Sequence, residues 1–138
     1  EMADALTATR NWLRSCPLID KANRFNVAYL GDKSVEYTLT TASETHKEDI
    51  CGGDLATYNL VFMARMPFGA ALGVNVAAAE FFAGLSAWVR EQERQHNYPA
   101  VDGYRATQVS ATNAGVVISA EANSAQYQLQ LQLNLEED

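Results

Sequence analysis

The side chains with the greatest capacity for chemistry in this sequence are two histidines and two cysteines. His46 stands just before Glu48 and Asp49, and His96 stands at the end of a long segment of helical periodicity. Metal sites usually combine several His, Cys or carboxylate ligands at a recognised spacing, and neither histidine belongs to such a motif. We interpret His46 as part of a solvated polar segment and His96 as a helix-capping residue. The sequence predicts no metal site.

Cys51 is the better candidate for a nucleophile, because it precedes Gly52 and Gly53 in a polar stretch whereas Cys16 precedes Pro17. A catalytic thiolate also needs a base and an oxyanion site, and the residues around Cys51 supply neither. The two glycines match neither a phosphate-binding loop nor a GxGxxG motif. We therefore predict no catalytic residue, no cofactor and two free thiols in a reducing cytoplasm.

The composition is that of one folded domain covering residues 1–138. Hydrophobic residues make up 48% of the 138 positions, and the formal net charge is −7, from 10 Lys and Arg against 17 Asp and Glu. This charge has the wrong sign for a protein that gains affinity by displacing counterions from phosphates. The apolar stretches are shorter than the roughly 18 residues that a membrane-spanning helix needs. We expect a soluble globular protein without a membrane partner.

The apolar periodicity predicts the elements that must position any functional residue. They are a short helix that ends before Pro17, an antiparallel hairpin of residues 25–29 and 35–39, a central strand at 58–65, a helix from an N-cap at Asn75 to about 95, a hairpin of 107–111 and 116–120, and a strand at 127–135. This order predicts an α+β fold. An antiparallel or mixed β-sheet carries one long helix and a shorter N-terminal helix, packed on one face.

Residues 41–54 form a polar stretch between two predicted strands. It contains charged and titratable side chains at Glu44, His46, Lys47, Glu48 and Asp49. The composition fits either an extended arm or a loose hairpin. If it is an arm, these five residues are candidates for contact with a partner.

The connection at residues 66–74 contains almost no polar side chain, although it must join a strand to a helix. Loops normally run over the surface, so an apolar loop is either tucked under the helix or covered by another chain. Phe68 and Leu72 are its large side chains and are candidates for a subunit surface.

The last strand alternates apolar residues with uncharged amides. The amides are Gln126, Gln128, Gln130, Gln132 and Asn134. An amide offers donors and acceptors without the cost of desolvating a full charge. A solvated face, a polar subunit contact and the lining of a channel all fit this row.

Several strings, in their order and spacing, resemble the minor capsid or tail-terminator-like proteins of long-tailed bacteriophages and prophages. The strings are Trp12 with Leu13, CPL at 16–18, YNLVF at 58–62 followed by Arg65, Asn75 leading into EFF at 80–82 and Trp88, Tyr98 with Pro99, and AQYQLQL at 125–131. Together they span most of the chain.

The resemblance implies a structural protein without catalytic or cofactor-binding residues, which caps the tail tube and takes part in head–tail joining as a ring of about six copies. The implied partners are further copies of the chain, the tail tube protein and the head–tail connector proteins. DNA would pass through without specific binding, and the protein would lie in the virion tail neck after assembly in the host cytoplasm. The amide row, Phe68 and Leu72 would then form subunit or lumen surfaces.

A second hypothesis belongs to a different class. A small cytoplasmic α+β domain could bind a ligand, or act as an enzyme, in a pocket between the long helix and the sheet. Tyr37, Tyr58 and Tyr127 would project their polar tips into that cavity.

Overall fold

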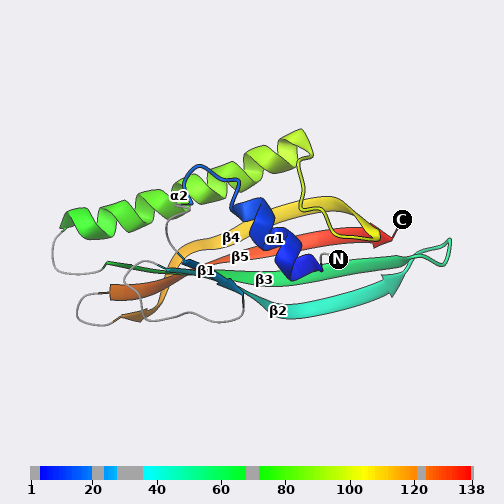
Figure 1. Cartoon of the computed structure of the whole chain (residues 1–138), viewed down its shortest axis with the longest axis horizontal. Coiled ribbons are helices and arrows are strands. Elements are labelled where there is room, and N and C mark those ends of the chain that lie inside the picture. The colour runs from blue at the N-terminus through cyan, green and yellow to red at the C-terminus, as the bar shows by residue number, and fades with distance from the viewer. Residues whose placement is uncertain (1–3, 20–23, 28–35, 68–71, 121–123, 138) are drawn as a thin grey trace.

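Five strands form one sheet, and two helices lie on one of its faces (Figure 1). The computed structural model describes residues 4–19, 24–27, 36–67, 72–120 and 124–137. The elements are α1 (Ala5–Leu13), β1 (Arg24–Val27), β2 (Glu36–Glu48), β3 (Asp54–Pro67), α2 (Leu72–Gln95), β4 (Tyr104–Ala120) and β5 (Ser124–Glu137). The predicted α+β class is confirmed.

The strand order is β1-β2-β3-β5-β4, so β3 is central, as predicted. β1 pairs with β2 in parallel, from Arg24 opposite Glu36 to Val27 opposite Leu39. The predicted antiparallel hairpin between these two segments is therefore wrong. Period-two alternation identifies a strand but does not set its direction, because side chains alternate between faces in either orientation. The pairs β2–β3, β3–β5 and β5–β4 are antiparallel, so the sheet is mixed.

The polar stretch at 41–54 is a paired hairpin, which is one of the two forms that its composition allowed. β2 pairs with β3 as far as Glu48 opposite Asp54. The Asp49 carboxylate closes the turn by accepting hydrogen bonds from the backbone N–H groups of Cys51 and Gly53, at 2.7 and 2.9 Å. Gly52 has a φ of 85°, which favours glycine. Backbone pairing with β3 therefore orders a segment whose composition alone is typical of a loop.

β4 is one continuous strand from Tyr104 to Ala120, so the predicted hairpin around residues 113–115 is also wrong. The register with β5 shifts between Thr112 and Val116, which marks a bulge. Gly115 has a φ of 80° there, and a Cβ at this position would lie 3.4 Å from the Phe82 Cβ of α2. A turn-like composition bends this strand without reversing it.

The helices begin and end with identifiable caps. The Asp4 carboxylate accepts a hydrogen bond from the Thr7 N–H at 2.8 Å and caps α1. α2 begins at Leu72, so Asn75 lies inside the helix and is not its N-cap as predicted. Beyond the C-terminus of α2, His96 has a φ of 57°, and the Asn97 N–H donates to the Gln92 carbonyl at 2.9 Å. His96 thus occupies the left-handed position that ends a helix.

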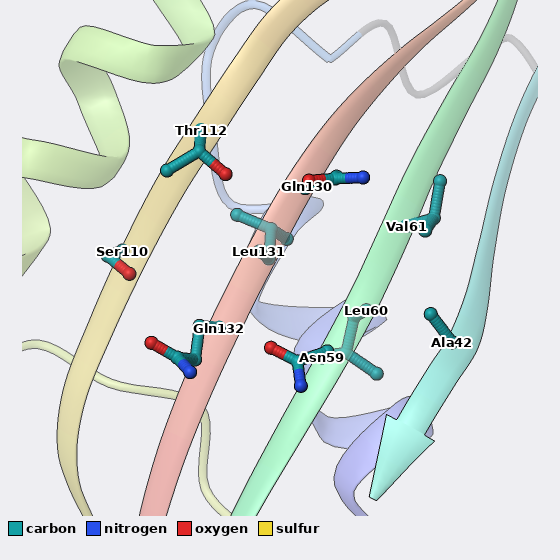
Figure 2. A pocket seen from close by; sticks show the side chains of 9 residues that line it. All are labelled: Ala42, Asn59, Leu60, Val61, Ser110, Thr112, Gln130, Leu131 and Gln132. Carbon is teal, nitrogen blue, oxygen red and sulfur yellow. The ribbon is translucent and has the colours of Figure 1, made fainter.

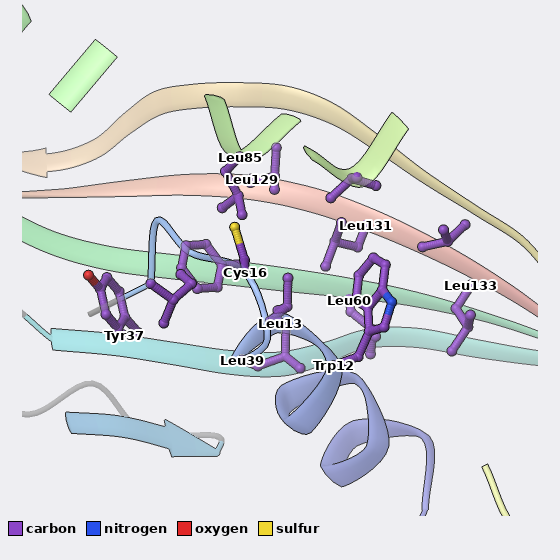
Figure 3. Close-up of a cluster of buried hydrophobic side chains, with 14 of the residues drawn as sticks. Trp12, Leu13, Cys16, Tyr37, Leu39, Leu60, Leu85, Leu129, Leu131 and Leu133 are labelled. Atoms are coloured by element: carbon purple, nitrogen blue, oxygen red, sulfur yellow. The ribbon is translucent and has the colours of Figure 1, made fainter. Parts of the chain in front are cut away.

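The hydrophobic core lies between the helices and the sheet (Figure 3). The two helices meet at Trp12 and Trp88, whose ring centroids are 4.8 Å apart. The Trp12 indole N–H also donates to the Asn97 carbonyl at 2.9 Å, which ties α1 to the end of α2. The buried side chains from the sheet include Leu39, Leu60, Phe62, Leu129, Leu131 and Leu133. Each such side chain contributes about 1.5–3 kcal/mol through burial.

Candidate functional site

The amide row of β5 lies on the face of the sheet that the helices leave open. Leu129, Leu131 and Leu133 point to the helices and are buried, and side chains alternate along a strand, so the amides point the other way. Figure 2 looks onto this open face, with α1 behind the strands. Gln126, Gln128 and Gln130 are half-buried and Gln132 is exposed. The structure thus brings the four predicted glutamines together on one surface.

Uncharged polar residues from the neighbouring strands extend this surface across the sheet. The paired rows are Gln130 with Val61 and Thr112, Gln132 with Asn59 and Ser110, and Asn134 with Thr57 and Gln108. Three hydrogen bonds join them across strands: Thr57 to Asn134 at 3.0 Å, Asn134 to Gln108 at 2.8 Å, and Asn59 to Ser43 at 2.8 Å. Charged side chains stand at the two ends, with Arg65 opposite Gln126 and an Arg105–Glu136 ion pair of 3.0 Å.

The open face is hollowed at two places. One hollow of about 290 Å³ is lined by Asn59, Val61, Thr112 and Gln130, among others (Figure 2). Another, of about 560 Å³, includes Thr45, Thr57 and Asn134 nearer the β2–β3 turn. Both hollows are lined mainly by hydroxyl, amide and apolar groups. The surface can therefore exchange hydrogen bonds with a partner without desolvating a dense set of charges.

Of the two candidates in the apolar connection, the structure describes only Leu72. Phe68 lies outside the described residues. Leu72 is the first residue of α2, so residues 72–74 belong to the helix, and only residues 68–71 separate β3 from α2. Residues 72–74 are therefore apolar residues of a helix, whereas the sequence predicted a loop there.

The five candidates near the β2–β3 turn divide into two groups. Asp49 closes the turn and has a structural role. Glu44, His46, Lys47 and Glu48 are exposed residues of β2. Because residues alternate, Glu44, His46 and Glu48 share the helix-bearing face of the sheet, and Lys47 lies on the open face. The structure does not bring the five together as one contact surface.

His46 lies between two carboxylates. Its Nε2 is 2.6 Å from Glu44 Oε2, and its Nδ1 is 2.7 Å from Asp54 Oδ2. Hydrogen bonding, first with Glu44 and then with Asp54, raises the pKa of His46 above its ordinary value. The pKa of Glu44 is lowered, chiefly by its hydrogen bond to His46. His46 thus makes charge-assisted contacts with one carboxylate of β2 and one of β3.

Two tyrosines extend this group. Tyr58 donates to Glu44 at 3.2 Å, and Tyr104 of β4 donates to Asp54 at 2.7 Å. The hydrogen bond to Asp54, together with burial, raises the pKa of Tyr104 to about 12. Conversely, the hydrogen bond from Tyr104, followed by that from His46, lowers the pKa of Asp54. The series Tyr58–Glu44–His46–Asp54–Tyr104 is called the hairpin network below.

Sequence reasoning missed Asp54, Tyr58 and Tyr104 as members of this network. Tyr104 is 50 residues from Asp54 and reaches it only because β4 and β3 both pair with β5. The available signal was the spacing of Glu44 and His46, which places them on one strand face if residues 41–48 form a strand. Because the sequence predicted an arm or a loose hairpin for that segment, the shared strand face of Glu44 and His46 was not recognised.

The thiols and the possible metal ligands have ordinary surroundings. Cys16 is buried and Cys51 is exposed, and both are free. Burial raises the pKa of the Cys16 thiol. Across the described part of the chain, no three His, Cys, Asp or Glu side chains are arranged to hold a metal ion.

The three tyrosines of the ligand-pocket hypothesis lie in two different environments. Tyr37 is 2% exposed and stacks on Phe62 at a centroid distance of 5.7 Å. Tyr127 is 6% exposed and packs on Phe82 at 5.7 Å. Tyr58 points instead to Glu44 in the hairpin network. Tyr37 and Tyr127 therefore belong to the aromatic part of the core.

The two edges of the sheet are protected in different ways. At the β4 edge, the Val109 N–H donates to the Glu93 carboxylate of α2 at 2.7 Å, and the Tyr98 hydroxyl, which donates to the same carboxylate, lies 3.3 Å from the Thr107 carbonyl. At the other edge, β1 covers β2 only as far as Leu39, and the rest of β2 has a register shift after Thr41 and several charged side chains. Bulges and charges on an edge strand oppose pairing with another chain.

Comparison of the sequence with protein-family models and with curated proteins finds no match. Among the helices of the described residues, none combines the length and the apolar composition that crossing a membrane requires.

Proposed function

We propose that this chain is a structural virion protein that caps the tail tube of a long-tailed bacteriophage or prophage and takes part in head–tail joining. It acts as a ring of about six copies, and its partners are the tail tube protein and the head–tail connector proteins. It has no catalytic step and needs no cofactor. Its binding energy is distributed over contacts between folded surfaces.

The open face of the sheet is the observation that carries the proposal. Four antiparallel strands place uncharged amides and hydroxyls side by side on it, and the helices cover only the opposite face. Removing water from such a surface costs less free energy than removing it from a charged surface. It supports a function in which the chain docks on another folded protein through a broad face.

The protected edges favour contacts through this face over strand addition. Glu93 and Tyr98 occupy backbone groups of β4 at one edge, and charges with a bulge interrupt the exposed part of β2 at the other. Ring closure needs two different patches on each copy. We assign the open face to one of them.

The charge of the chain suits a ring through which DNA passes. The formal net charge is −7, from 10 Lys and Arg against 17 Asp and Glu. A neutral or acidic wall forms few attractive contacts with phosphates. DNA therefore moves past such a wall without specific binding.

Negative-stain electron microscopy and light scattering of the purified chain test the proposal. The expected result is ring-shaped particles with a mass of about six times the 15.1 kDa protomer, more abundant as the protein concentration rises. A chain that stays monomeric at every concentration, and whose melting temperature rises with a small-molecule ligand, would contradict it and support the pocket hypothesis.

A further inference from the structure

His46 has a partner for each of its two ring nitrogens, and both partners are carboxylates. Nε2 lies 2.6 Å from Glu44 on β2, and Nδ1 lies 2.7 Å from Asp54 on β3. A neutral imidazole donates from one nitrogen and carries a lone pair on the other. Only the imidazolium can therefore donate to both carboxylates, whereas a neutral ring directs a lone pair at a carboxylate oxygen.

We propose that protonated His46 is a pH-dependent clamp, which holds the outer end of β2 on β3 and, through Asp54, on β4. Loss of its proton releases one of the two carboxylate contacts and lets the hairpin end open. This inference does not rest on the proposed function, since it concerns the order of one part of the sheet.

The clamp acts on a part of the sheet with little else to hold it. Residues 41–48 are all exposed, and β1 pairs with β2 only from Glu36 to Leu39. Opposite His46, the buried side chains are Ala56 of β3 and Leu135 of β5, and β2 contributes none between residues 41 and 48. Segments with few buried apolar contacts open at a low free-energy cost. A change at one side chain can therefore shift the balance between closed and open hairpin ends.

The carboxylates around His46, which belong to β2, β3 and β5, favour its charged form. The titratable groups near the ring are Glu44, Lys47 and Glu48 of β2, Asp54 and Tyr58 of β3, Tyr104 of β4 and Glu137 of β5, with Asp4 of the α1 cap acting on Tyr58. Four of these strand groups are carboxylates and Lys47 is the one cation. The Glu137 carboxylate also accepts from the Asp54 N–H at 3.0 Å. The two phenols donate to the same carboxylates that His46 contacts.

The direction of the pH dependence follows from these contacts. The pKa of His46 is raised above 6.5, first by Glu44 and then by Asp54, so its contribution is complete below about 6.5 and is lost as pH rises through the raised pKa. The pKa values of Glu44 and Asp54 are lowered, so their contribution is lost as pH falls through those lowered values. The clamp is closed between these two limits.

Amide hydrogen exchange measured by NMR tests the clamp on the intact chain. After correction for intrinsic exchange, the protection of amides at 44–48 should fall as pH rises from about 6.5, and it should level off above the pH at which the His46 ring protons titrate. The fold-change in protection should equal the ratio of the His46 acid dissociation constants in the open and closed hairpin. Amides of β5 between Leu129 and Leu133 should keep their protection over the same range.

Two variants separate the clamp from a general effect of pH. His46→Gln should abolish the pH dependence at 44–48, whereas His96→Asn, which changes the other histidine and tolerates the left-handed backbone, should retain it. Glu44→Gln should lower the midpoint of the His46 titration. A pH dependence that persists in His46→Gln, or unchanged protection while His46 titrates, would overturn the proposal.

Discussion

Alternate residues of β5 lie in two different environments although they belong to one strand. Leu129 and Leu133 are 0% exposed beneath the helices, whereas Gln128 and Gln132 lie on the face that no helix covers. The covered residues belong to a core cluster with side chains from α1, β2, β3, α2 and β4. The open residues meet hydroxyls, amides and single apolar side chains. One strand thus carries the core of the fold on one side and the proposed contact surface on the other.

This difference separates the residues that stabilise the chain from those that can serve a partner. Burial of apolar area stabilises the folded state, and the amides add little to it because they exchange hydrogen bonds with water for hydrogen bonds with each other. Substitutions on the two faces should therefore change different properties of the protein. Those on the covered face should change stability, and those on the open face should change association.

The largest expected effect on stability is a difference between two neighbouring residues of β5, Leu129 and Gln128. Leu129→Ala should lower the free energy of unfolding by about 2–5 kcal/mol, because it leaves a cavity among fully buried side chains. Gln128→Ala should change it by no more than about 0.5 kcal/mol. Urea denaturation of the two variants measures both values. Similar losses in the two would show that the open face is part of the core.

A smaller effect is expected where β4 bends beneath α2. Gly115→Ala should destabilise the chain by about 1–2 kcal/mol, because Gly115 has a φ of 80°. Gly103→Ala is the matched control, since Gly103 has a φ of 83° with no heavy atom within 4 Å of an added Cβ. An added Cβ at Gly115 would touch Phe82 at van der Waals distance, and a strand packed under α2 relaxes less than the exposed turn at Gly103, so thermal melting should show the larger loss at Gly115. An equal loss would mean that α2 does not constrain the bend.

The contact of Glu93 with the β4 edge should give the smallest loss of stability. Glu93→Gln should cost about 1 kcal/mol, because it replaces the carboxylate that accepts from the Val109 N–H and the Tyr98 hydroxyl. Burial and the hydrogen bond to Glu93 raise the pKa of Tyr98 to about 12. This pKa should fall in the variant but stay above 10, because burial remains. NMR titration of ring-labelled tyrosine measures it, and an unchanged pKa would exclude the contact.

The sequence predicted the fold class and the two faces of β5, because both depend on local periodicity. Between Tyr127 and Leu135, five apolar residues stand at every second position, and this pattern fits a strand with one apolar face. The direction of β1 and the continuity of β4 could not be predicted in the same way. Both depend on pairing between segments distant in the chain, and the turn-like residues at 113–115 fit a bulge as well as a reversal.

The candidate surfaces were predictable to different degrees. The glutamines share a face by strand geometry alone. The hairpin network could not be found in this way, because His46 meets Asp54 only after residues 41–48 pair with β3, and Tyr104 reaches Asp54 across β5. Polar composition at 41–54 is compatible with a loop, and tertiary pairing overrides that local preference.

Light scattering of two lysine variants tests most directly whether the open face makes the contact between copies. Gln128→Lys places a charge on the open face, and Ala87→Lys places the same charge on an exposed position of α2. The account predicts that Gln128→Lys lowers the mass of the assembly towards 15.1 kDa, whereas Ala87→Lys keeps the wild-type mass. A Gln128→Lys variant that assembles as fully as the wild type would contradict the account.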